Sequence, residues 1–189
     1  MTGPALVLAT GNAHKLREFD RLLAGAVALE AMPAGLELPP ETGETFAANA
    51  LIKARAVAAA TGRAAIADDS GIGAEAIDWR PGVYSARYSG PSATDQENLD
   101  KLIAEVPPGT ALRYTCVIAH VAPDGVETLF EGTCDGVMAA EAAGAGGFGY
   151  DPVFLMPDGR TMAELSDDEK DAVSHRGVAA RRLLEWLGS

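Results

Sequence analysis

The stretch AAIADDSG at residues 64–71 combines a short apolar run with two adjacent carboxylates. The apolar half, residues 64–67, predicts a buried strand that ends at Asp68 and Asp69. Adjacent side chains at the end of a strand usually point to opposite sides, so one carboxylate can face a cleft while the other supports the backbone. Asp, Ser and Gly also favour turns. These residues alone therefore support a surface turn and a Mg²⁺-binding carboxylate pair about equally.

Strand and helix patterns continue on both sides of this stretch. The apolar run at 5–9 predicts a strand that enters a glycine-containing turn, and the spacing over 13–23 predicts a helix after it. The other patterns predict a strand at 27–32, a Pro- and Gly-rich loop at 33–43, an alanine-rich helix at 45–60, an extended segment at 72–77, a loop at 81–91, a helix at 92–104, a hairpin of strands at 112–121 and 126–137, and a last helix at 174–187. A mixed α/β fold follows, in a single domain of residues 1–189.

Charge and composition exclude several classes of protein. Of the 189 residues, 48% are hydrophobic and 22% are charged, which is typical of a globular chain. The net charge of −12, with no run of Lys or Arg, argues against nucleic acid as a partner. A small anion stays possible, because local cations and a metal ion can override a distant negative field.

The cysteines and the absence of long apolar runs bear on where in the cell the protein is found. Cys116 and Cys134 do not form a CxxC pair, so zinc is not expected and both read as free thiols in a reduced environment. No apolar run approaches the roughly 20 residues that cross a bilayer. We therefore expect a cytoplasmic chain with no membrane partner.

The turn from Thr10 to Lys15 is a candidate phosphate site. Its sequence, TGNAHK, stands where the first strand meets the first helix, and a helix N-terminus offers free N–H groups and a partial positive charge. Lys15 adds a full charge, although the spacing is not that of a P-loop. The alternative is a plain N-cap by Asn12 with a solvated Lys15, which the segment alone favours.

Two isolated charged residues, Glu41 and Lys53, lie between the first helix and the Asp68-Asp69 pair in the sequence. Glu41 is a possible second metal ligand beside Asp69, and Lys53 lies on the following helix. By itself, each of them reads as a solvated residue.

Two segments in the second half could bind a base. The three glycines around Phe148 and Tyr150 would let the backbone approach a flat ligand, or the aromatic rings could simply pack into the core. Lys170 is followed by Ser174, a good N-cap, which places His175 and Arg176 in the first turn of the last helix. They could hold a base edge or a phosphate, or belong to an ordinary capped helix.

Taken in order, six segments resemble one family. They are LATGNAHKLREF, ETGETFAANALIKA, AIADDSGI, PGVYSARYSG, GGFGYDPVF and EKDAVSHRG, and they span residues 8–177. This pattern resembles the inosine/xanthosine triphosphate pyrophosphatases, also called noncanonical purine NTP pyrophosphatases or HAM1-like proteins. PGVYSARYSG and ATDQENL are typical of the bacterial branch.

The resemblance implies both a fold and an activity. The fold has two lobes around a long mixed β-sheet with flanking helices, and the active site lies in the cleft between the lobes. The implied protein is a Mg²⁺-dependent homodimer. It would cleave dITP, ITP or XTP between the α- and β-phosphates to a nucleoside monophosphate and pyrophosphate, which keeps deaminated purines out of DNA and RNA.

The resemblance also implies a role for each matching residue. Asp69 would be the general base and a metal ligand, with Glu41 as the second ligand. The implied substrate-binding residues are Thr10, Gly11, Asn12, Ala13, His14, Lys15, Lys53, Ser70, Phe148, Gly149, Tyr150, Asp151, Lys170, His175 and Arg176. Of these, His175 and Arg176 would read the 6-keto edge, because a donor there favours a 6-oxo purine over adenine, whose amino group would leave that donor unpaired.

One departure from the family and two competing functions follow from the sequence. Many bacterial members carry a Glu before the Asn of the second helix, whereas this chain has Ala48 before Asn49. If that Glu binds metal in those members, the metal-ligand set of this chain is smaller. A related house-cleaning pyrophosphatase acting on modified pyrimidine or methylated nucleotides is one alternative. A nucleotide-binding regulator without turnover is another, and the presence of both Asp68 and Asp69 argues against it.

Overall fold

The computed structural model describes residues 5–189, which form two compact units. Unit 1 consists of the described chain up to Asp69 together with Cys116–Gly132 and Arg176–Ser189, and unit 2 consists of Ser70–Thr115 and Thr133–His175. Each unit is thus assembled from separate stretches of sequence. Residues 1–4 of the expected domain lie outside the described part.

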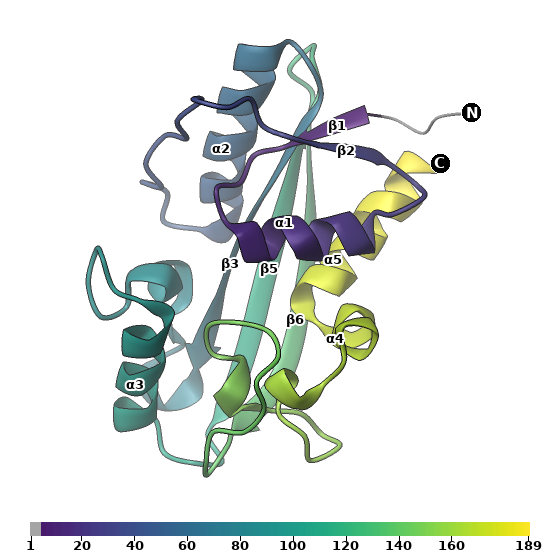
Figure 1. Cartoon of the computed structure of the whole chain (residues 1–189). Helices are drawn as coiled ribbons and strands as arrows, with labels where there is room; N and C mark the ends of the chain where they lie inside the picture. Colours follow the sequence, from purple (N-terminus) through teal and green to yellow (C-terminus); the bar gives the residue numbers. More distant parts are fainter. Residues whose placement is uncertain (1–4) are drawn as a thin grey trace. The chain divides into compact units, whose positions relative to one another are not determined.

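The strands form a mixed seven-stranded sheet in the order β2-β1-β3-β5-β6-β7, with β4 paired to β3. The strands are β1 Ala5–Leu8, β2 Ala28–Ala31, β3 Ala65–Ala74, β4 Arg80–Pro81, β5 Ala111–Val121, β6 Glu127–Met138 and β7 Phe154–Leu155. β1 pairs in parallel with β2 and β3, while β4 and β7 pair antiparallel with β3 and β6. The helices, labelled in Figure 1, are α1 Ala13–Leu22, α2 Phe46–Thr61, α3 Asp95–Glu105, α4 Asp167–Val173 and α5 His175–Leu187. The expected mixed α/β class is confirmed.

Unit 1 has a core on each face of its strands. Leu6 and Leu8 of β1 pack with residues of α1 and α5, whereas Val7 and Ala9 pack with residues of α2. This follows from the strand period of two, which sends alternate side chains to opposite faces. Figure 1 shows α1 and α5 crossing in this unit, with α2 running alongside β3. Helices therefore cover both faces of the strands in unit 1.

Helix α2 is the alanine-rich helix expected at 45–60. The Thr45 side chain accepts a hydrogen bond from the Ala48 N–H, and Gly62 ends the helix in the left-handed conformation with φ 65°. Small residues at Ala50, Ala54 and Ala58 are buried and allow the helix to lie close to the sheet. The cap and the terminating glycine fix the helix ends within one residue of the expected bounds.

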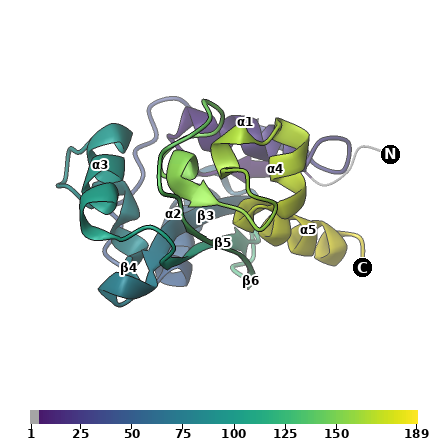
Figure 2. The same ribbon diagram turned by 90° about the horizontal axis from the view of Figure 1, so that it is seen from below.

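Unit 2 has one core, formed mainly by residues of β3, α3, β5, β6, β7 and the 3₁₀ turns. Its buried members include Ile72, Leu102, Tyr114, Phe154 and Met162. Helix α3 begins with a capping box, in which Thr94 and Glu97 satisfy each other's backbone N–H groups. Figure 2 views α3 and α4 of this unit from below.

Strand β3 differs from the sequence expectation. It does not end at Asp68 and Asp69 but continues without interruption to Ala74, so the expected break at residues 68–71 is wrong. The turn preference of Asp-Asp-Ser-Gly is overridden because both carboxylates are buried against distant partners and because Gly73 pairs with Pro81 of β4.

Helix α4 was not expected from the sequence. It begins with a capping box formed by Ser166 and Glu169. Its seven residues are too few for a clear helical period. Within residues 5–189, no helix is both long and apolar enough to span a membrane.

Candidate active site

The adjacent carboxylates of Asp68 and Asp69 lie on opposite faces of β3. Ile66 packs with α1 and α5, whereas Ala65 and Ala67 pack with α2. Because side chains alternate along a strand, Asp68 shares the face of Ile66, and Asp69 shares the face of Ala67. The expected divergence of the two carboxylates is confirmed by their contacts.

Asp68 is the centre of a buried charge cluster in unit 1. Its carboxylate is only 1% exposed, and its Oδ2 accepts from Lys15 Nζ at 2.9 Å and from Arg176 Nη2 at 3.3 Å. Its Oδ1 has no hydrogen-bond partner among the described residues. Burial acts to raise the pKa of Asp68, but Lys15, Arg176 and Lys53 outweigh burial and hold the pKa well below its usual range. Asp68 is therefore a permanent anion.

Arg176 is held between two carboxylates. It is 2% exposed, and its Nη1 donates to Glu18 of α1 while its Nη2 donates to Asp68. Burial lowers the pKa of Arg176, but Asp68 and Glu18 outweigh burial and raise it. The guanidinium thus links α5 to α1 and β3. Its neighbour His175 belongs to unit 2, where its ring stacks on Tyr114.

The turn from Thr10 to Lys15 forms the start of α1. The Asn12 side chain accepts from the N–H groups of His14 at 2.9 Å and Lys15 at 3.2 Å, and the Asn12 N–H donates to Thr10 Oγ1 at 3.1 Å. The N-cap expected at Asn12 is confirmed. Residues 11–14 are exposed, including Gly11 and Ala13. Lys15 is not a solvated residue, because it pairs with Asp68. The turn therefore presents an accessible helix start beside a fixed cation.

Asp69 lies on the α2 face and is positioned by Asn49. Asn49 Nδ2 donates to Asp69 Oδ2 at 2.9 Å, and Asn49 Oδ1 accepts from the Gly43 N–H at 2.8 Å. A Cβ on Gly43 would lie 2.7 Å from both Ala48 Cβ and Asn49 Oδ1, so only glycine fits this close approach. One buried amide therefore connects the loop that carries Glu41 to the carboxylate of β3.

Lys53 and Glu41 complete the charges on this face. Lys53 Nζ donates to Glu41 Oε1 at 2.5 Å. Burial lowers the pKa of Lys53, but Asp68, Glu41 and Asp69 together outweigh burial and raise it. For Asp69 the balance is different, since burial and Glu41 raise its pKa more than Lys53, Asn49 and Lys15 lower it. A carboxylate with a raised pKa is suited to accept a proton near neutral pH.

The donors on this face fit a magnesium ion. Among the described residues, no group of three or more His, Cys, Asp or Glu side chains is arranged to hold a metal. Mg²⁺, however, needs only one or two carboxylates, with waters and substrate phosphates as the other ligands. Asp69 and Glu41 raise the energy of each other's ionised form, and a divalent cation would relieve that repulsion.

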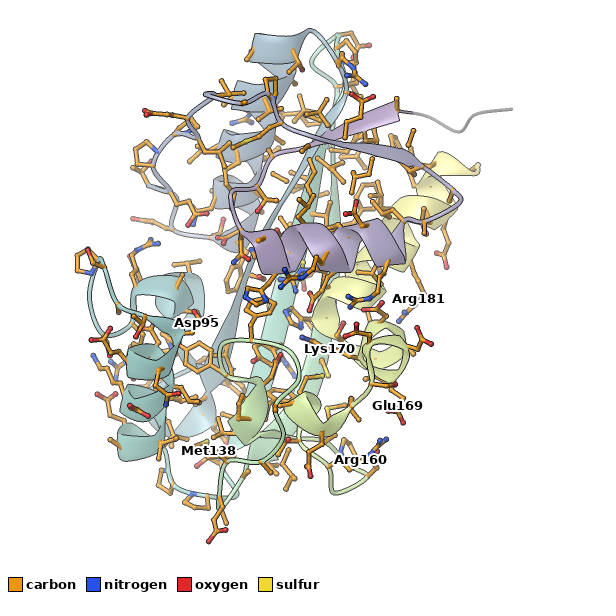
Figure 3. All side chains as sticks on the ribbon, in the orientation of Figure 1. Asp95, Met138, Arg160, Glu169, Lys170 and Arg181 are labelled. Carbon is orange, nitrogen blue, oxygen red and sulfur yellow. The ribbon has the colours of Figure 1, made fainter. Side chains whose placement is uncertain are left out.

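In unit 2, three donors meet the carboxylate of Asp151. Its Oδ2 accepts from Lys170 Nζ at 2.7 Å and from the Phe148 N–H at 3.0 Å, while its Oδ1 accepts from the Tyr114 hydroxyl at 3.0 Å. Lys170 Nζ also lies 5.1 Å from the centre of the Phe148 ring. Figure 3 marks Lys170 on its short helix. Three of the expected base-site residues therefore form one cluster.

The other expected residues of unit 2 take several positions. His175 stacks on Tyr114 with ring centres 4.5 Å apart. Tyr150 lies in the core, where its hydroxyl donates to the Ser85 carbonyl at 2.7 Å and burial raises its pKa, as the core interpretation expects. Ser70 on β3 and Gly149 with φ 64° are partly exposed.

Sequence reasoning missed three residues of these clusters. Glu18 lies one helical turn after Lys15, which is a detectable signal for a shared face of α1. In the sequence, Asn49 drew attention only because Ala48 precedes it where many relatives have Glu. The signal that could have identified Asn49 is its polar side chain among the buried alanines of α2. Tyr114 gives no local signal, because it reads as an ordinary strand residue.

Comparison with known proteins places this architecture in a family. The sequence model of the Ham1 family matches residues 6–186. The chain belongs to the Ham1 family. The Ham1-family match agrees with relatives named dITP/XTP pyrophosphatase. The relative from Erwinia tasmaniensis is 47% identical, and the alignment covers 99% of this chain and 96% of the relative. The relative from Yersinia pseudotuberculosis is 48% identical, and the alignment covers 96% of this chain and 97% of the relative.

Solved Ham1-family structures share the fold. The Ham1 protein of Coxiella burnetii has a TM-score of 0.88 at 39% identity, covering all of this chain (100%) and 99% of its own. The nucleoside-triphosphatase, or dITP/XTP pyrophosphatase, of Mycobacterium abscessus has a TM-score of 0.74 at 43% identity, covering 95% and 98%. The mixed sheet with flanking helices is thus the fold of the Ham1 family.

Replacing Gly147 by alanine should disrupt the Asp151 cluster. A Cβ there would lie 2.0 Å from Asp151 Oδ2, and the backbone has φ 67°. Gly125→Ala is the control, because Gly125 has φ 87° with no heavy atom within 4 Å. Backbone strain of about 1 kcal/mol applies to both, so the free energy of unfolding in urea should fall further for Gly147→Ala. Equal losses would contradict the described packing.

Replacing Arg176 by methionine should strongly destabilise unit 1. The change leaves Glu18 and Asp68 without a shared cation, which costs about 3–5 kcal/mol for a buried ion pair. The control is Arg113→Met, since the Arg113–Asp135 pair is exposed and such pairs contribute about 1 kcal/mol or less. Urea denaturation measures both variants. Similar losses for the two would show that the buried cluster is not a major stabilising element.

Proposed function

We propose that this chain hydrolyses noncanonical purine nucleoside triphosphates, namely dITP, ITP and XTP, to the nucleoside monophosphate and pyrophosphate. The observation that carries the proposal is Asp69, a buried carboxylate with a raised pKa that Asn49 orients beside Glu41 and Lys53. The names and the close identity of the dITP/XTP pyrophosphatases support the same activity.

The triphosphate would be bound by groups of unit 1. Lys15 and Lys53 supply positive charge, and the start of α1 supplies the N–H groups of a helix N-terminus. Asp69 and Glu41 would hold Mg²⁺, which when bound neutralises charge on the phosphate oxygens. Phosphoanhydride cleavage depends mainly on such neutralisation and on an oriented water.

Asp69 would activate the attacking water. The water gives a proton to the Asp69 carboxylate as its oxygen bonds to phosphorus, and the bond between the α- and β-phosphates breaks with release of pyrophosphate. Asn49 fixes the orientation of the carboxylate, and burial raises its affinity for the proton. Asp68, with its lowered pKa, cannot take this role and instead positions Lys15.

The base would be bound by groups of unit 2. Phe148 can stack on a purine ring, and donors from Lys170 and His175 favour the oxygen at position 6 over an amino group. Guanine carries the same oxygen, so this contact separates dITP from dATP but not from dGTP. The expected homodimer and the cytoplasmic location stay predictions.

A substrate comparison tests the proposed activity. With Mg²⁺ present, the rate of pyrophosphate release should be highest for dITP and XTP, and at least tenfold lower for dATP and dUTP at equal concentration. Such a ratio is within the range that one hydrogen-bonding contact provides. Chelation of the metal should abolish release. A preference for dUTP would instead favour the pyrimidine-directed alternative.

Replacing Asp69 by asparagine should separate binding from turnover. The amide keeps the shape of the side chain but cannot accept the proton, so kcat should fall by about 10²–10⁴, while ITP still binds. Asp135→Asn is a matched control, because Asp135 is an exposed residue paired with Arg113. Unchanged turnover in the Asp69 variant would exclude Asp69 as the base.

Replacing Asn49 by alanine should shift the pH profile. Asn49 donates to Asp69 and lowers its pKa, so loss of the amide raises that pKa further. A base must be ionised, so kcat/KM falls as the pH drops through its pKa, and the acidic limb should move to higher pH. Asn98→Ala is the control, since that buried amide contacts Ser89 and Ala86 instead. If the acidic limb of the pH profile does not move, the ionisation that controls kcat/KM is not that of Asp69.

A further inference from the structure

Tyr114 of β5 contacts two of the proposed base-binding residues in unit 2. Its hydroxyl donates to Asp151, and its ring stacks on His175. We infer that Tyr114 is a positioning residue that aligns both groups and so sets the preference of this chain for 6-oxo over 6-amino purines. The inference rests on the proposed function and names the residue on which its base selectivity depends.

The hydroxyl group organises the Asp151 cluster. Tyr114 donates to Oδ1, which leaves Oδ2 for Lys170 Nζ and the Phe148 N–H. The side chains of Asp151 and Lys170 are shielded from water, since Asp151 is 3% exposed and Lys170 is 4% exposed. A buried carboxylate is held in one orientation when each oxygen has a donor. The hydroxyl therefore determines where the ammonium of Lys170 and the backbone of Phe148 lie.

The ring of Tyr114 sets the plane of His175. Their ring centres are 4.5 Å apart and the planes differ by only 9°. Tyr114 also stacks on Phe154 with ring centres 4.5 Å apart, and Phe154 is fully buried at the start of β7. The imidazole is thus aligned with a ring that the core of unit 2 holds in place.

The plane of an imidazole determines where its hydrogen bonds point. Its N–H and its lone pair both lie in the ring plane. A hydrogen-bond donor discriminates an oxo group from an amino group only when its direction is fixed. A fixed donor that faces an amino group has no acceptor and stays unpaired, whereas a mobile donor can turn to another acceptor. Stacking on Tyr114 provides this restraint for His175, and the hydroxyl of Tyr114 provides it for Lys170 through Asp151.

A plain packing role does not account for the hydroxyl. Leu112, which precedes Tyr114 by two positions and so shares its face of β5, lies in the same core and is fully apolar. A phenylalanine would fill the same volume without a polar atom that needs a partner. The tyrosine oxygen is instead directed to the carboxylate that orients Lys170.

The test compares Tyr114→Phe, Tyr114→Leu and the control Leu112→Ala. Tyr114→Leu should lower the ratio of kcat/KM for dITP to that for dATP by about tenfold, because both restraints are lost. Tyr114→Phe keeps the ring and loses one of the two restraints, so it should lower this ratio less than Tyr114→Leu does, while raising the KM for dITP by about tenfold. Leu112→Ala should lower the urea midpoint without changing the ratio. Tyr114→Met replaces Tyr114→Leu if the leucine variant does not fold.

A second readout does not depend on turnover. The chain has 3 histidines, so comparison with His175→Gln assigns the His175 ring proton in an NMR spectrum. Tyr114→Leu should move this resonance out of the position imposed by the stacked ring, and Tyr114→Phe should not. If the wild-type protein hydrolyses no dITP, the proposed function fails, and this resonance alone decides whether Tyr114 positions His175.

Two results would overturn the inference. One is a folded Tyr114→Leu variant that keeps the wild-type ratio of dITP to dATP or leaves the His175 resonance in place. The other is a Leu112→Ala variant that loses selectivity to the same extent, because the effect would then come from loss of core packing in general.

Discussion

The buried carboxylate of Asp68 is the constraint on which unit 1 depends. An ion that is removed from water must be compensated, and here Lys15 of α1 and Arg176 of α5 both bind one of its oxygens. Two helices that are distant in sequence are thereby attached to one point of β3. The same contacts determine which face of the strand Asp68 occupies, and that choice places Asp69 on the face of α2.

The two carboxylates are chemically identical, and their surroundings make them different. Cations near Asp68 lower its pKa, whereas burial near Asp69 raises its pKa. Pairs of titratable groups whose environments separate their pKa values commonly divide the roles of charge anchor and proton acceptor. Here the pKa values of two neighbouring aspartates move in opposite directions, since Lys15 and Arg176 contact Asp68, whereas Asn49, Glu41 and Lys53 surround Asp69.

Local patterns in the sequence were sufficient for most of the fold. The continuous apolar run at Leu6, Val7 and Leu8 predicts a buried strand. Asn12 and Thr45 mark helix starts because their side chains accept from the first free N–H groups. The continuation of β3 through Asp68 and Asp69 was not predictable, because its cause lies in distant partners. The resemblance named the expected site residues, but it did not reveal Glu18, Asn49 or Tyr114. Asn49 meets a carboxylate 20 positions away, and Tyr114 meets one 37 positions away.

The alternation of side chains along β3 also restricts how this protein can change length during evolution. Loss or gain of a single residue between Ala65 and Asp68 would send the side chain of every following position in the strand to the opposite face. Such a change would carry Asp68 away from Lys15 and Arg176 and Asp69 away from Asn49, although both aspartates are still present. Substitutions in this strand alter one contact at a time, whereas an odd-numbered insertion or deletion exchanges the two environments at once.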